Sequence, residues 1–206
     1  MRPVIPPEIT AALTDAVCEI ETHSCAEVVV EVRSRSGSYA HAEARFAALA
    51  AFVALLFLLF SPWPFAAYWV AIDVAIVYAA GLFVARRSDG VRRLMTREAE
   101  RRAQVRTQAA AVFHDRGVAN TSGETGMLVY LSLLEKRLEI LADRGVLLAV
   151  PALPWNQLVE RAQGCPGTPQ SLVDFVRPLA PLLGEYLPAR EGDVDELANA
   201  PRFSHE

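Results

Sequence analysis

Acidic side chains stand at the ends of the apolar segments of this 206-residue chain. Glu27 opens a valine-rich segment, Glu124 precedes a second apolar segment, and Asp143 follows a third. Binding groups in α/β folds gather at strand ends, and carboxylate oxygens are preferred ligands of Ca²⁺ and Mg²⁺. If the three carboxylates converge, they form a divalent-cation site. The alternative is structural: Glu27 and Glu31 are solvated strand-edge charges, and Asp143 caps a helix or pairs with Arg144.

Motifs of known hydrolytic and metal-binding chemistry are missing from the sequence. It contains no Cys-x5-Arg loop, no Gly-x-Ser-x-Gly elbow, no glycine-rich phosphate loop and no His-Glu-x-x-His. The three cysteines, an odd number at irregular spacing, indicate a reducing compartment. Cys18, His23 and Cys25 lack a fourth ligand at a standard zinc spacing, so buried structural cysteines are predicted, with zinc as the alternative.

A long apolar stretch dominates the first half of the chain, with no charged residue from Phe46 to Ile72. Ser61-Pro62-Trp63-Pro64 interrupts it with two prolines, which stop a helix, and a tryptophan, which suits a membrane interface. The sequence therefore predicts two membrane spans, 42–60 and 65–85, each near the ~20 residues that a crossing needs. The alternative is a buried hairpin in a soluble domain. So short a chain has little material to surround two helices that are apolar on every face.

Charge is distributed unevenly around these spans. The net charge is −4, yet eight arginines and only three acids lie between residues 86 and 106. Arg86, Arg87, Arg92 and Arg93 directly follow the second span, whereas the turn between the spans carries no charge. The positive-inside rule then places both termini in the cytoplasm, with the basic block against anionic lipid. Nucleic-acid binding is the weaker alternative for this block, because it lacks interleaved aromatic residues.

Asp73 lies in the middle of the second span. A charged residue is costly there, and such residues are often functional. One acid without an evident partner leaves several interpretations open. Asp73 could face a protein neighbour, pair across a dimer, remain neutral, or have a structural role.

The rest of the chain alternates between helical and strand patterns. Helices are predicted at 6–21, 96–116, 155–162 and from Thr168 to a break at Pro178 and Pro181. Strands are predicted at 27–33, 127–133 and 137–142. This order predicts an α/β fold, a small mixed sheet flanked by helices, with the hairpin inserted after the first strand. The predicted divisions are 1–41, the hairpin 42–85, 86–187, and an acidic, disordered tail 188–206.

Three segments carry a resemblance to a known family. They are Ser24-Cys25-Ala26-Glu27-Val28-Val29-Val30 ahead of Arg35-Ser36-Gly37-Ser38-Tyr39, the segment from Gly123 to Leu133, and the segment from Glu135 to Val146. Together with Trp155 and a helix end between Leu179 and Pro188, they make residues 8–188 resemble the TPM-domain family. The chain is most similar to the bacterial branch with a membrane hairpin inside the domain.

The resemblance implies several functions. Some relatives are linked to acid phosphatase activity, to photosystem repair or to assisting a receptor, and some bind calcium through acidic residues. We therefore expect a bacterial inner-membrane protein with a cytoplasmic TPM-like domain that assists or docks another membrane or membrane-associated protein. The alternative is a metal-assisted phosphatase that uses Glu27, Glu124 and Asp143 with calcium or magnesium.

Overall fold

The computed structural model describes residues 5–63, 66–189, 196–197 and 200–204. The chain divides into two compact units. Residues 1–36 and 102–206 form the first, which we call the α/β domain, and residues 37–101 form the second, which we call the helical unit. Each unit is described by itself below.

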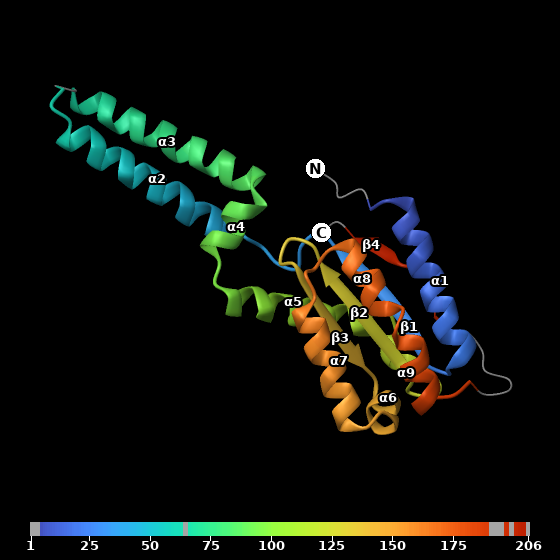
Figure 1. Cartoon of the computed structure of the whole chain (residues 1–206). Helices are drawn as coiled ribbons and strands as arrows, with labels where there is room; N and C mark the ends of the chain where they lie inside the picture. The colour runs from blue at the N-terminus through green and yellow to red at the C-terminus, as the bar shows by residue number, and fades with distance from the viewer. Residues whose placement is uncertain (1–4, 64–65, 190–195, 198–199, 205–206) are drawn as a thin grey trace. The chain divides into compact units, whose positions relative to one another are not determined.

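A four-stranded mixed sheet forms the centre of the α/β domain (Figure 1). Its strands are β1 (Glu27–Arg33), β2 (Gly126–Ser132), β3 (Arg137–Ala142) and β4 (Arg202–Ser204), in the order β3-β2-β1-β4. β1 runs parallel to both β2 and β4, while β2 and β3 are antiparallel. Parallel neighbours need a long crossover connection, and the segment between β1 and β2 supplies it.

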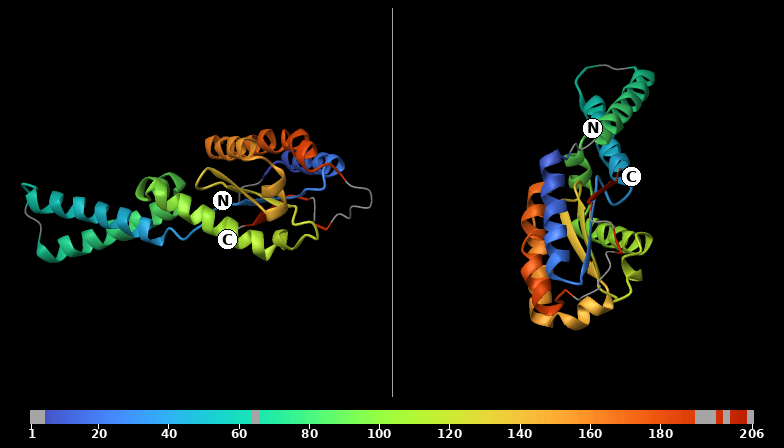
Figure 2. Two further views of the ribbon diagram at one scale, coloured as in Figure 1. Left: turned by 90° about the horizontal axis from the view of Figure 1, so that it is seen from below. Right: turned by 90° about the vertical axis from the view of Figure 1, so that its right-hand side faces the viewer.

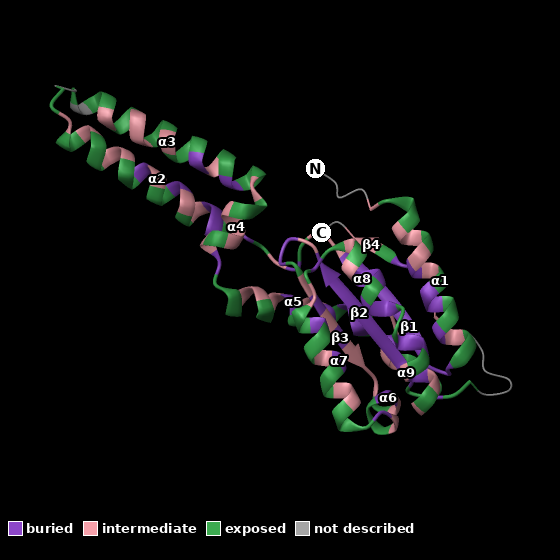
Figure 3. Ribbon diagram, in the orientation of Figure 1, coloured by how far each residue is buried: buried purple, intermediate pink, exposed green. Residues whose placement is uncertain are grey.

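Helices cover both faces of this sheet, giving three layers (Figure 2). One face packs against α1 (Pro7–His23), α7 (Ala152–Gly164), α8 (Pro169–Val176) and α9 (Leu179–Tyr186). The other packs against α5 (Glu98–Asp115) and η1 (Val118–Asn120). Because side chains alternate along a strand, Val28, Val30 and Val32 enter the first core and Val29 the second. The central strands are accordingly buried (Figure 3).

Local sequence signals account for most of these elements. The predictions for β1 and β3 are confirmed residue for residue, and those for α1, β2 and α7 within a few residues. Thr168 and Ser171 form a capping box at the start of α8, with Pro169 in the first turn. The predicted late break is confirmed too, since α8 ends at Val176 and α9 begins after Pro178.

Four short elements were not predicted, η1 among them. α6 (Arg144–Ala149) follows β3 directly, and α4 (Asp89–Met95) precedes α5. β4 lies within the segment predicted to be a disordered tail, so that prediction is wrong for residues 202–204. Residues 190–195, 198–199 and 205–206 of that segment lie outside the described residues.

Two long antiparallel helices make up most of the helical unit: α2 (Ala40–Phe60) and α3 (Ala67–Arg87). Small residues meet where the two helices come close, since a Cβ added at Gly81 would lie 3.0 Å from the Cα of Ala47. The large apolar side chains point outward, including Phe57, 62% exposed, and Phe83, 61% exposed. The inserted pair of helices is therefore present, and both are long and apolar enough to cross a membrane.

The close approach of β2 to η1 gives a test of the fold. A Cβ at Gly126 would overlap the carbonyl oxygen of Val118, whereas a Cβ at Gly164 meets nothing within 4 Å. We expect Gly126→Ala to destabilise the protein by more than ~3 kcal/mol, because backbone must move. Gly164→Ala, the matched control, should change stability by less than ~1 kcal/mol. Thermal unfolding in mild detergent measures both, and equal effects would contradict the described packing.

Candidate functional site

Two glutamates of β1 lie on the sheet face that packs against α5. Glu27 is 8% exposed and Glu31 is fully buried. Glu27, Val29 and Glu31 occupy every second position of the strand, so their side chains share one face. Val29 belongs to the core on the α5 side of the sheet. The interpretation of Glu27 and Glu31 as solvated edge charges is therefore wrong, because both side chains are removed from water.

Glu27 holds the C-terminal segment. Its two carboxylate oxygens accept hydrogen bonds from the backbone N–H groups of Glu196 at 3.4 Å and Leu197 at 3.3 Å. The carboxylate of Glu196 in turn accepts hydrogen bonds from the backbone N–H and the hydroxyl of Ser122. Both hydrogen bonds are long for a charged acceptor, and together they connect this end of β1 to residues 196–197.

Glu31 binds the chain further along, at Ser204. The hydroxyl of Ser204 donates to its Oε1 at 2.6 Å, and the guanidinium of Arg116 lies 3.3 Å from each of its oxygens. The Nε of Arg33 donates to the same Oε1 at 3.5 Å. A buried carboxylate must be paired, and Glu31 is paired with groups from β1, β4 and the end of α5.

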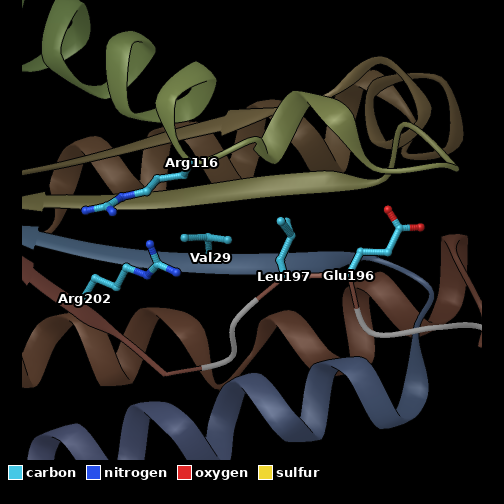
Figure 4. A pocket seen from close by; sticks show the side chains of 5 residues that line it. All are labelled: Val29, Arg116, Glu196, Leu197 and Arg202. Carbon is cyan, nitrogen blue, oxygen red and sulfur yellow. The ribbon is translucent and has the colours of Figure 1, made fainter.

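A cavity of about 290 Å³ lies beside these groups. Its lining residues are Val29, Arg116, Glu196, Leu197 and Arg202 (Figure 4). Arg202 stands opposite Glu31 in the register of β1 and β4. Figure 4 shows Arg116 and Arg202 on opposite sides of the strand that carries Val29, both at the end away from Glu196, whose carboxylate is turned away from them.

The other two predicted metal ligands lie near the same end of the sheet. The backbone carbonyl of Glu124 accepts a hydrogen bond from Gly145 at 2.8 Å, and the backbone N–H of Asp143 donates to Gly126 at 2.8 Å. The Asp143 carboxylate caps α6 by accepting from the backbone N–H of Arg144 at 2.7 Å. This cap is the structural role that we gave as the alternative.

Across the described ranges 5–63, 66–189, 196–197 and 200–204, no three His, Cys, Asp or Glu side chains form a group able to hold a metal ion. The cation site at Glu27, Glu124 and Asp143, and the phosphatase that would use it, stay predictions of the sequence.

A second buried polar cluster joins the end of β1 to the end of β2. The hydroxyl of Ser36 lies 2.8 Å from those of Tyr130 and Ser132, and its backbone N–H donates to Glu135 at 2.9 Å. Ser132 also donates to the carboxylate of Glu135. Burial raises the pKa of Tyr130 to about 12, against the opposing effects of the Ser36 hydrogen bond and of Arg33. Tyr130 therefore stays protonated at neutral pH.

Several charged residues of the helical unit are also paired. Glu43 is buried, and its carboxylate lies 3.4 Å from Nε of Arg86 and 2.9 Å from Nη2 of Arg92. The guanidinium of Arg87 stacks over Phe83 at 4.9 Å. Asp73 is partly exposed in the middle of α3, and no hydrogen bond to it is found among the residues the structure describes.

Comparison with known proteins adds a fold neighbour. No family model and no curated protein matches the chain. A solved structure that is similar is the NMR structure of the BA42 protein from the psychrophilic bacterium Bizionia argentinensis. The two share 17% sequence identity with a TM-score of 0.56, over 99% of this chain and 98% of that chain. At this identity the likeness shows a shared α/β fold and leaves the TPM family as a prediction.

Arg116, Arg202 and the Ser36 cluster were not predicted from the sequence. Arg116 belongs to a predicted helix and Arg202 to the predicted tail. Their places beside Glu31 of β1 depend on contacts across 85 and 171 positions, respectively. One signal was available: Glu27 and Glu31 stand in a strand that is otherwise valine-rich, and buried acids need partners.

The hydrogen bonds that Glu27 accepts from residues 196 and 197 can be tested by hydrogen exchange. We expect Glu27→Gln to speed exchange of the Leu197 amide about tenfold, because a neutral amide accepts weaker hydrogen bonds than a carboxylate. Glu160→Gln, on an exposed site of α7, is the control and should leave this amide unchanged. Unchanged exchange in Glu27→Gln would show that Glu27 does not hold the segment.

The pKa of Tyr130 gives a pH-dependent prediction. A folded-state value of about 12, above the ordinary 10.0, stabilises the protein fully below pH 10 and loses this effect as pH rises to 12. Tyr130→Phe also loses the hydrogen bond to Ser36, so near pH 8 it should be ~1 kcal/mol less stable than wild type. The difference should shrink, then reverse, between pH 10 and pH 12. A difference that is constant over this range in denaturant unfolding would contradict the buried, protonated phenol.

Proposed function

We propose that this chain is an integral membrane protein of the bacterial inner membrane, anchored by α2 and α3, whose α/β domain binds and assists another membrane or membrane-associated protein. The observation that carries the proposal is that most apolar residues of α2 and α3 face outward and are exposed. Only 17% of the α2 window and 11% of the α3 window are buried within the protein. A core helix of a soluble domain is buried, whereas a bilayer solvates outward-facing apolar residues.

The composition of the α2–α3 contact supports the same proposal. Buried residues of α2 are small apart from one acid, namely Ala42, Glu43, Ala47 and Ala51. Lipid-embedded helices associate through such small residues, because their large apolar side chains gain nothing by leaving the lipid. Trp63, 65% exposed, lies in the turn, and Trp69, 52% exposed, lies at the start of α3, as interfacial aromatic residues do.

Basic residues at the other end of the hairpin support an orientation with both termini in the cytoplasm. Arg86, Arg87, Arg92 and Arg93 follow α3, and the turn carries no charge. Leu94, 76% exposed on the short helix α4, lies among these arginines. An exposed leucine among arginines suits the surface of an anionic leaflet, where apolar and charged groups are both solvated.

Exposed leucines on the α/β domain support the binding role. Leu147 and Leu148 on α6 and Leu153 on α7 are 48%, 74% and 70% exposed. The three lie within seven residues of sequence. Clustered exposed apolar residues on a soluble domain mark interaction surfaces more often than scattered ones do. We call these three residues the leucine patch.

Cysteine labelling in cells tests the membrane topology. Cys18 is exposed on the α/β domain, so a variant retaining it alone reports the side of the termini. A matched variant carries Trp63→Cys as its single cysteine. A membrane-impermeant maleimide should label Trp63→Cys in intact spheroplasts and should label Cys18 only after lysis. Labelling of Cys18 before lysis, or of neither residue before lysis, would contradict this topology.

Site-specific photo-crosslinking tests the leucine patch. A crosslinker in place of Leu148 should capture one defined protein from the membrane fraction, and Leu153→Glu should reduce that product at least fivefold, because a charge disfavours an apolar interface. The control places the crosslinker at Gln157, exposed on α7. Equal capture from both positions, or no effect of Leu153→Glu, would contradict a role of the patch in binding.

A further inference from the structure

The cavity beside β1 is cationic at one end. Arg116 and Arg202 line it from two different elements, the end of α5 and the strand β4. Arg33 lies beside them on β1 through its contact with Glu31. Arg33 and Arg116 both contact the carboxylate of Glu31, and Arg202 stands opposite Glu31 in the register of β1 and β4.

The acids near the cavity that belong to the described residues have other partners. Glu31 is engaged by Ser204, Arg33 and Arg116. Glu196 is bound to Ser122, and its carboxylate points away from the arginines (Figure 4). Glu27 accepts from the backbone of residues 196 and 197. Over the described part of the chain, no hydrogen bond or ion pair engages the guanidinium of Arg202.

We infer that this cavity binds a small organic oxyanion, a carboxylate or a phosphate that carries a short apolar group. Two guanidinium groups from different directions match the several acceptor oxygens of such a group. Val29 and Leu197 supply apolar wall for the rest of the ligand. At about 290 Å³ the cavity is at the lower limit of small-molecule sites, so we set the ligand at metabolite size.

Recognition divides between the two arginines. Arg116 is oriented by its contacts with both oxygens of buried Glu31, so its position does not depend on the ligand. Arg202 is exposed. Because Arg33 and Arg116 already pair with Glu31, that carboxylate does not neutralise the positive charge of Arg202. A charged hydrogen bond from Arg202 therefore contributes to ligand binding and little to folding.

Calorimetric titration of the full chain in uncharged detergent tests the inference, with sodium butyrate and inorganic phosphate as probes at matched ionic strength. We expect saturable binding of at least one probe, and Arg202→Gln should weaken it about tenfold or more. Arg144→Gln, an exposed arginine at the start of α6, is the charge-matched control and should leave affinity unchanged. Since Arg202 lacks partners in the described chain, its variant should unfold at the wild-type temperature.

The two probes and a further variant separate the ligand classes. Leu197→Ala should weaken the binding of butyrate, which contacts the apolar wall, and leave the binding of phosphate unaffected. Binding of butyrate identifies the ligand class as a carboxylate. Binding of phosphate alone identifies it as a phosphate. The inference is overturned if neither probe binds wild type. It is also overturned if Arg144→Gln weakens binding as much as Arg202→Gln, because attraction would then be general to the surface.

Discussion

The outward-facing side chains of α2 and α3 are the constraint on which the rest of this structure depends. Apolar surface costs roughly 25 cal/mol per Å² when water covers it, and both helices are mostly exposed. The chain itself leaves most of these residues unburied, since the buried residues of α2 are three alanines and Glu43. A bilayer would solvate them. The charge-free turn, the flanking tryptophans and the arginines after α3 are consistent with that environment.

The position of the hairpin in the chain is compatible with an intact α/β domain. β1 and β2 are parallel neighbours, so a crossover must connect them in any case, and the helical unit lies within this crossover. Buried contacts, polar before the hairpin and apolar after it, then fix both sides of the insertion. Ser36, the last residue of the domain before the hairpin, is held by Tyr130, Ser132 and Glu135. After the hairpin, the α5 residues Val105, Ala109 and Val112 are buried in the second core.

β1 also organises the C-terminal segment. Glu27 and Glu31 occupy alternate positions of one strand face, and each binds a group from residues 196–204. Burying two acids in a valine-rich strand costs stability unless both are paired, and this requirement explains why so short a strand as β4 is held in register. The same groups bring Arg202 to the cavity. The pairing of the two buried acids of β1 therefore also places the arginines at the end of the cavity that could attract an anion.

How much of this could be predicted from the sequence depends on the range of the interactions. Strand β1, strand β3 and the capped start of α8 follow from alternation and capping within a few residues, and were predicted correctly. α6 has only six residues and β4 only three, too few for a periodic pattern. The pairing of Glu27 with residues 196 and 197 spans about 170 positions, so no local signal reports it. The acids at strand ends were the right residues to single out, but Glu27 and Asp143 bind backbone N–H groups.

The central claim is that lipid, not protein, covers α2 and α3. Alkaline carbonate extraction of membranes from expressing cells tests it directly, because this treatment releases peripheral proteins and leaves those that span the bilayer. The account predicts that the full chain stays in the membrane pellet and enters solution only with detergent. Release of the chain into the carbonate supernatant as a monodisperse protein would contradict it.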